Sequence, residues 1–140
     1  NIWNFRKFVF TIHSRILYRR RKMFLSSIFI NAAGYSKIVT QAIREISKHY
    51  AEPLSLNSVA KKLKITPQYL SKLFMKETET TFVNYLTALR IEKAKLLLKN
   101  TDQRINLICR QIGYPDPKYF CTLFKKEVGV TPNQYRSNHI

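Results

Sequence analysis

The chain has 140 residues, of which 45% are hydrophobic and 13% aromatic, so it can bury a modest core but is too short for a large catalytic fold. Its 25 basic and 8 acidic residues give a net charge of +17, which favours polyanionic partners. The apolar and aromatic content indicates a folded cationic protein rather than a disordered basic tail. Glycine is scarce and apolar residues recur at helical spacing, which predicts an all-α fold.

The first 35 residues carry seven basic residues and no acidic one. An apolar stripe in residues 2–18 predicts an amphipathic helix, and it comprises Ile2, Phe5, Val9, Ile12 and Ile16. The apolar run at residues 23–30 is too short for a transmembrane segment, which needs about 20 residues. We interpret residues 1–35 as a linker or interdomain helix. The alternative is a membrane-surface or helix–helix interaction module through residues 1–30.

A composition change near Gly34 predicts a domain boundary, with one domain over residues 36–140. Ser36 and Ser55 are predicted to open the first two helices, and the second helix is expected over residues 56–63. Residues 82–98 contain neither Gly nor Pro and predict one uninterrupted helix, about 25 Å long.

Residues 66–77 (TPQYLSKLFMKE) recur as residues 116–127 (DPKYFCTLFKKE). Each copy opens with a cap residue and a proline, and each follows a short apolar helix and a tight turn. This plan is typical of a helix-turn-helix, and the two units are expected at about residues 55–78 and 104–128. Successive major grooves lie about 34 Å apart, a span that two units on a helical spacer can cover.

The second helix of each unit has an apolar face that is expected to pack inward, formed by Leu70, Leu73 and Phe74 and by Phe120, Leu123 and Phe124. The opposite faces can contact double-stranded DNA. The candidates for base contact are Gln68, Ser71, Lys72, Lys118, Cys121 and Thr122. The candidates for phosphate contact are Thr66, Lys76, Thr81, Lys125 and Lys126.

Other chemistries have little support in the sequence. The three histidines and two cysteines are scattered, which argues against a metal site, and Cys109 and Cys121 fit a reduced chain with inert thiols. No cofactor motif or catalytic constellation is present, so an enzyme is not expected. The repeated positions of Tyr69 and Tyr119 favour partial packing over base stacking.

Two ordered sets of residues follow the pattern of a known domain. The first set comprises Leu54, Ser55, Leu56, Val59, Ala60, Tyr69, Leu70, Ser71, Leu73, Phe74, Lys76, Glu77, Thr78, Phe82, Tyr85, Leu86, Arg90 and Ala94. The second set comprises Gly113, Tyr114, Asp116, Tyr119, Phe120, Phe124, Lys125, Lys126, Gly129, Thr131, Pro132, Tyr135 and Arg136. Together these residues resemble the DNA-binding domain of AraC/XylS-type transcription regulators over about residues 36–136.

The resemblance implies a seven-helix domain with two recognition helices in consecutive major grooves. It also implies a cytoplasmic transcription factor, such as an activator that contacts RNA polymerase, and a companion domain that binds an effector, dimerises or receives a phosphate. The chain is expected to be a fragment of that larger regulator, with a homodimer formed through the missing domain or residues 1–35. The family match of Arg90 favours an internal ion pair.

Two departures from the family pattern carry predictions. Lys64 and Glu79 stand where the family usually has glycine, so a left-handed conformation at either would cost about 1 kcal/mol. The first unit is therefore predicted to be the less rigid one. Cys121 and Thr122 stand where a small polar residue and an arginine are common, so strong guanine recognition by this helix is not expected.

Overall fold

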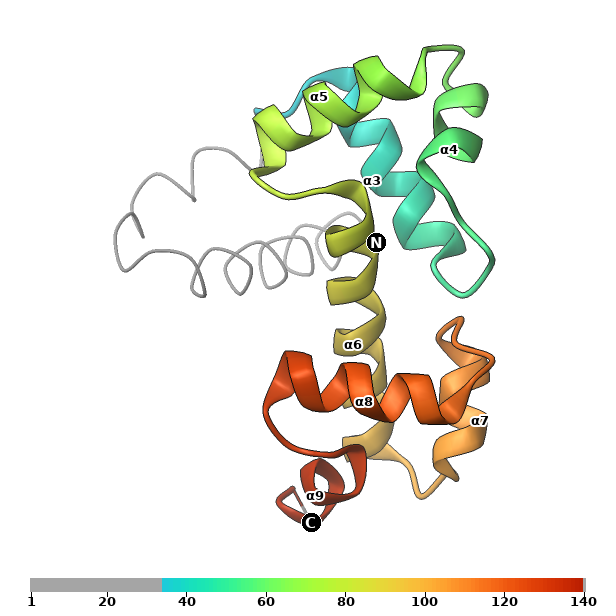
Figure 1. Ribbon diagram of the computed structural model, residues 1–140, viewed down its shortest axis with the longest axis vertical. Helices are drawn as coiled ribbons and strands as arrows, with labels where there is room; N and C mark the ends of the chain where they lie inside the picture. The colour runs from blue at the N-terminus through green and yellow to red at the C-terminus, as the bar shows by residue number, and fades with distance from the viewer. Residues whose placement is uncertain (1–33, 140) are drawn as a thin grey trace, which may run out of the picture. The chain divides into compact units, whose positions relative to one another are not determined.

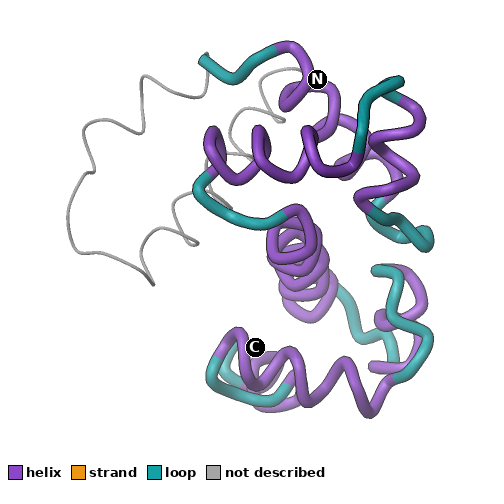
Figure 2. The backbone as a smooth tube through the Cα atoms, turned by 45° about the horizontal axis from the view of Figure 1, so that its top comes forward, coloured by secondary structure: helices purple, strands orange, loops and turns teal. Residues whose placement is uncertain are grey.

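The computed structural model describes residues 34–139, which form seven α-helices and contain no strand (Figure 1). Helices and short loops alternate along the whole described chain (Figure 2). The all-α prediction is confirmed. The amphipathic helix expected in residues 2–18 lies outside the described residues. The helices are α3 (Lys37–His49), α4 (Leu56–Lys62), α5 (Pro67–Thr78), α6 (Phe82–Asn100), α7 (Ile105–Gln111), α8 (Pro117–Val128) and α9 (Pro132–Ser137).

The described chain divides into two compact units. The first unit consists of residues 34–48 and Ser55–Ala88, and the second consists of His49–Leu54 and residues 89–139. Helix α6 contributes its first seven residues to the first unit and the rest to the second. The loop His49–Leu54 therefore belongs to the second unit, although both of its sequence neighbours belong to the first.

Side-chain caps mark the start of most helices, and the sequence predicted those at Ser36 and Ser55. Ser55 Oγ accepts the Ser58 amide, and Ser58 Oγ accepts the Ser55 amide in return, which closes a capping box at the start of α4. The Ser36 hydroxyl accepts the Val39 amide at 3.3 Å and opens α3. Thr131 caps α9 through a second capping box with Gln134. These bonds satisfy backbone amides that have no partner inside their helix.

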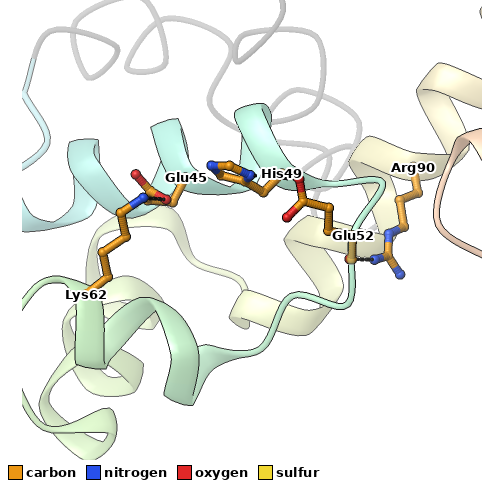
Figure 3. Close-up of polar contacts among 5 residues, drawn as sticks. All are labelled: Glu45, His49, Glu52, Lys62 and Arg90. Carbon is orange, nitrogen blue, oxygen red and sulfur yellow. Dashed lines mark hydrogen bonds and ion pairs between the residues drawn. The ribbon is translucent and has the colours of Figure 1, made fainter.

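The core of the first unit lies between α3, α4, α5 and the start of α6. Phe74 is fully buried, and its ring lies 5.8 Å from that of Phe82 and 5.5 Å from that of Tyr85 in edge-on geometry. The other buried apolar residues are Val39, Ala42, Ile43, Ile46, Val59, Ala60, Leu70 and Leu86. On the surface of this unit the Lys62 ammonium binds the Glu45 carboxylate at 2.7 Å and joins α4 to α3 (Figure 3).

The core of the second unit repeats this arrangement with α7, α8 and the second part of α6. Its buried members are Ile91, Ala94, Leu98, Ile108, Cys109, Ile112, Tyr114, Phe120 and Phe124. Phe120 and Phe124 take the places that Leu70 and Phe74 hold in the first unit, and all four are fully buried. The predicted inward faces of α5 and α8 are confirmed, since Leu123 also packs against this core and its counterpart Leu73 is half-buried.

Candidate nucleic-acid interface

The turn of each helix-turn-helix has the same hydrogen bonds. In the first unit the Lys64 amide bonds Lys61 O at 3.2 Å and the Ile65 amide bonds Ala60 O at 3.1 Å. The second unit repeats both bonds at Gly113 and Tyr114, at 3.3 and 2.8 Å. Such a pair of bonds needs a left-handed residue directly after the helix end. The φ angles agree, at 57° for Lys64 and 91° for Gly113.

A second left-handed position ends each recognition helix. Glu79 follows α5 with a φ of 57°, and Gly129 follows α8 with a φ of 96°. Together with the turns, the first unit holds Lys64 and Glu79 in a conformation that the second unit assigns to glycine. The left-handed conformation that the sequence analysis considered for Lys64 and Glu79 is confirmed. A side chain in this region is expected to cost about 1 to 2 kcal/mol.

The N-terminal ends of the recognition helices α5 and α8 are capped alike. The Thr66 hydroxyl accepts the Tyr69 amide at 3.2 Å, and the Asp116 carboxylate accepts the Lys118 amide at 2.9 Å. Pro67 and Pro117 occupy the first helical turn. Both predicted caps are confirmed. Thr66 and Asp116 thus have a structural role that does not depend on DNA.

The outer face of α5 brings together every base-contact candidate of the first unit. Gln68, Ser71 and Lys72 are exposed, and so is Met75, at 41%. The amide of Gln68, the hydroxyl of Ser71 and the ammonium of Lys72 offer donors and acceptors that suit base edges. The exposed Met75 adds an apolar surface of the kind that contacts a thymine methyl group.

The outer face of α8 offers fewer exposed hydrogen-bonding groups than that of α5. Lys118 and Thr122 are exposed, but the Thr122 hydroxyl donates to Lys118 O at 3.1 Å within the helix. Cys121 is half-buried and packs against the core of the second unit, so its sulfur is only partly turned outward. Of the three base-contact candidates here, Lys118 is therefore the one with an exposed hydrogen-bond donor on a long side chain.

All five phosphate-contact candidates are exposed, namely Thr66, Lys76, Thr81, Lys125 and Lys126. The Thr81 hydroxyl accepts the Asn84 amide at 3.1 Å near the start of α6, so this threonine also has a capping role. Lys76 and Lys126 occupy the same repeat position in the last turns of α5 and α8.

Arg90 differs from its prediction. Its Nη2 donates to Glu52 O at 2.9 Å (Figure 3). Its Nε donates to Tyr50 O at 2.7 Å, so both acceptors are backbone carbonyl oxygens. The expected ion pair with an acid is therefore wrong. The guanidinium also lies 5.0 Å from the centre of the Tyr114 ring. An arginine that offers several donors can hold a loop by its backbone, which no charge pattern in the sequence reveals.

The surroundings of Gly113 explain its lack of a side chain. A Cβ at this position would lie 2.9 Å from Tyr50 O and 3.0 Å from the guanidinium of Arg90. No such obstacle exists at Gly129, where a Cβ would meet nothing within 4 Å. The turn of the second unit is thus closed against the loop His49–Leu54, and Arg90 binds that same loop.

The two cysteines lie in poorly reactive surroundings. Burial raises the pKa of the Cys109 thiol to about 11, and burial also raises the pKa of Cys121. A raised pKa leaves little of the nucleophilic thiolate at neutral pH, which agrees with the expected inertness. Within residues 34–139, no group of His, Cys, Asp or Glu side chains could hold a metal ion, and no helix is long and apolar enough to cross a membrane.

A family model described as a helix-turn-helix domain matches residues 59–138, which is more than half of the chain. The chain belongs to the AraC/XylS family of helix-turn-helix domains. Among curated proteins it is 39% identical over 111 residues to YijO of Escherichia coli strain K12, an HTH-type transcriptional regulator described as uncharacterized. That alignment covers 79% of this chain and 39% of YijO.

Solved structures of related domains superpose on the described fold. The C-terminal domain of AraT, a response regulator from Geobacillus stearothermophilus, is 41% identical with a TM-score of 0.76, over 77% of this chain and 90% of that domain. A transcriptional regulator from Chromobacterium violaceum with an AraC-type DNA-binding domain is 25% identical with a TM-score of 0.71, over 76% and 96% of the two chains.

Membership of the AraC/XylS family settles the class of activity. This chain is a DNA-binding domain of the kind that regulates transcription, and its family is one of regulators rather than enzymes, as the sequence predicted. It spans about two fifths of the length of YijO and about a third of YpdC, a second E. coli relative.

Proposed function

We propose that this domain binds double-stranded DNA sequence-specifically, with α5 and α8 in successive major grooves, and that it serves a larger transcription regulator. The observation that carries the proposal is the duplication of one capped helix with an exposed outer face. In both units a buried apolar face fixes the helix, and polar or basic side chains cover the other side. A helix presented in this way is the element that enters a major groove.

The two recognition helices contribute unequally to base recognition. Helix α5 supplies base contacts through Gln68, Ser71 and Lys72, all of which are exposed. In α8 the Thr122 hydroxyl donates to its own helix and Cys121 is half-buried, so base contact rests mainly on Lys118. The first unit therefore carries most of the sequence discrimination.

Contacts with the sugar–phosphate backbone supply most of the affinity in both units. The exposed cations Lys76, Lys125 and Lys126 and the hydroxyls of Thr66 and Thr81 are the proposed phosphate ligands. With a net charge of +17, the chain is expected to lose affinity steeply as salt rises, by about 0.9 in the logarithmic slope for each phosphate neutralised.

The wider setting of the domain completes the proposal. The DNA-binding domain begins near residue 36, and residues 1–35 link it to the remainder of a cytoplasmic regulator. That regulator contacts RNA polymerase, either as an activator or as a repressor, and it dimerises outside the DNA-binding domain. The partial coverage of the curated relatives supports a longer protein of this kind.

The test is selection of bound sequences from a random duplex library at near-physiological salt, with the whole chain and with a chain that begins at Ser36. The expected result is a bipartite motif, with centres about one helical turn apart and the stronger information in one half. Absence of any enriched motif would overturn sequence-specific binding. Loss of the motif in the shorter chain alone would overturn the proposed boundary near residue 36.

One variant and its control then test which residue reads one base position of the motif. Lys72→Ala is expected to relax the preference at one base position, at a cost of about 1 to 3 kcal/mol on the preferred site. Lys37→Ala, which removes an exposed lysine from α3, is the matched control and should leave the motif unchanged. An unaltered motif in Lys72→Ala would contradict the assignment of base contact to this residue.

A further inference from the structure

Two tyrosines stand out on the recognition helices because they are aromatic, exposed and repeated. Tyr69 in α5 is 50% exposed and Tyr119 in α8 is 57% exposed, and both lie in the first turn of their helices. They occupy the same position in the two units, three residues after the caps Thr66 and Asp116. Exposure of a large aromatic at both copies is unusual for a residue that only packs.

The neighbours of each tyrosine along its helix are mainly polar or cationic. Tyr69 shares one edge of α5 with Lys72 and Lys76, at three and seven residues' distance, and both lysines are exposed. Tyr119 shares the corresponding edge of α8 with Thr122 and Lys126, which are exposed as well. A tyrosine with a lysine two turns later is thus the common pattern of both helices. This edge borders the outer face that carries the base-contact candidates.

One of the two rings has a visible support. The Tyr119 ring lies 5.9 Å from the ring of Tyr114, which is 93% buried, since its exposed fraction is 7%. Tyr114 in turn lies under the guanidinium of Arg90, at 5.0 Å from the ring centre. A ring held in this way on one side keeps a defined direction, so its hydroxyl loses little rotamer freedom when it binds a ligand.

Stacking on bases does not fit these positions. A duplex presents base edges and phosphates to a helix in its groove, whereas base faces become accessible only in single strands or flipped nucleotides. A phenol hydroxyl is a good donor, and phosphate oxygens are strong acceptors that tyrosine commonly contacts in protein–DNA complexes. The lysines on the same edge favour the same anionic ligand.

We propose that Tyr69 and Tyr119 are a matched pair of DNA-backbone contacts, in which each phenol hydroxyl donates a hydrogen bond to a phosphate oxygen. This inference rests on the proposed insertion of α5 and α8 into DNA. It adds two residues to the interface that the amino-acid pattern alone assigned to packing. It also gives both units an equal anchor, despite their unequal outer faces.

The test uses Tyr69→Phe, Tyr119→Phe and the double variant of the full chain, because phenylalanine removes only the hydroxyl. Each single variant is expected to bind about threefold to tenfold more weakly, by the same factor on the selected operator and on an unrelated duplex. The salt dependence of binding should stay unchanged, because a phenol carries no charge to release counterions.

The matched control is Tyr50→Phe, which removes a hydroxyl from the loop His49–Leu54, away from both recognition helices in sequence. It is expected to leave both affinities unchanged. Thermal unfolding of every variant is measured alongside, and midpoints equal to that of the native chain are expected, since the altered hydroxyls lie on half-exposed side chains.

Three outcomes would overturn the inference. Unchanged affinity in the double variant would remove the contacts altogether. A loss confined to the operator would make the tyrosines base readers, and a loss that follows a lower unfolding midpoint would make them packing residues. Failure of the proposed function is distinguishable, because it appears as absence of sequence preference in the native chain, while the comparison on unrelated duplex still tests the tyrosines.

Discussion

The two helix-turn-helix units reach the same backbone geometry with different residues. At the turn and after the recognition helix, the first unit places Lys64 and Glu79 in the left-handed region, whereas the second unit places Gly113 and Gly129 there. The hydrogen bonds that close the two turns are nevertheless the same in kind. The packing of the helices and their caps therefore fixes the turn, and glycine only lowers its cost.

The two glycines of the second unit are favoured at their positions for different reasons. Gly129 is favoured by its φ angle alone, because a Cβ would meet nothing within 4 Å. Gly113 is favoured by its φ angle and by the lack of space, because a Cβ would lie 2.9 Å from Tyr50 O. The first unit has Lys64 and Glu79 at these positions, so it carries backbone strain that the glycines of the second unit avoid.

The largest expected effect comes from filling the closed turn. Gly113→Ala should destabilise the chain by about 3 kcal/mol, because backbone strain adds to a clash with Tyr50 O and the Arg90 side chain. Gly129→Ala should cost only about 1 to 2 kcal/mol, since strain acts there alone. Urea unfolding of both variants measures the difference. Equal losses would show that the crowding at Gly113 has no energetic consequence.

The next effect concerns the loop that only the second unit holds. Arg90→Gln should destabilise the chain by about 2 kcal/mol, because it removes two charge-assisted bonds to the carbonyls of Tyr50 and Glu52. Glu52→Gln is the matched control, since it keeps the carbonyl that accepts from Arg90. If Glu52→Gln destabilised the chain as much as Arg90→Gln, Arg90 would have to form an ion pair with the Glu52 carboxylate.

A smaller and opposite effect is expected where the first unit is strained. Lys64→Gly or Glu79→Gly should stabilise the chain by up to about 1 kcal/mol, because relief of strain slightly exceeds the added entropy of the unfolded chain. Lys61→Gly, at an exposed position inside α4, should instead cost about 1 kcal/mol. Thermal unfolding distinguishes the variants. If Lys64→Gly lost as much stability as Lys61→Gly, the left-handed conformation of Lys64 would not be a source of strain.

The smallest effect concerns Tyr35, which lies in the first unit just before α3. Burial, followed by the charges of Glu77 and Glu79, raises the pKa of Tyr35 to about 12. The neutral phenol is therefore favoured in the folded chain, and this stability is present below pH 10 and is lost as pH rises from 10 to 12. Because Tyr35 is partly solvated, the loss should remain below about 1 kcal/mol.

The measurement is the free energy of unfolding against pH for the native chain and for Tyr35→Phe. The variant should show the shallower decline between pH 10 and 12, since it has no proton to lose at this position. Both chains share every other titrating group. Identical declines would mean that the environment of Tyr35 has no influence on stability.

The sequence predicted most of what depends on local chemistry. Thr66 and Asp116 were recognised as caps, and the inward faces of α5 and α8 followed from spacing, because caps and faces are decided within a few residues. The length of α6 was slightly underestimated, since it continues past its last apolar residue, Leu98, to Asn100.

What the sequence did not predict depends on contacts between distant segments. Arg90 binds backbone carbonyls 40 and 38 positions earlier, and a backbone acceptor has no residue type that a pattern could reveal. Cys121 falls on the outer side of α8 by spacing, yet it packs against the core. Tyr69 and Tyr119 were assigned to packing because aromatic identity alone does not report exposure.

The loop His49–Leu54 has a consequence for how the domain can be divided. A fragment that begins at Leu89 keeps the second helix-turn-helix but loses the carbonyls that Arg90 binds. Those carbonyls belong to residues 49–54, which lie in the sequence between the two segments of the first unit. The second half of the sequence is therefore not an independent unit, although it repeats the motif of the first half. It would become independent only if residues 49–54 were supplied in trans or grafted onto the fragment.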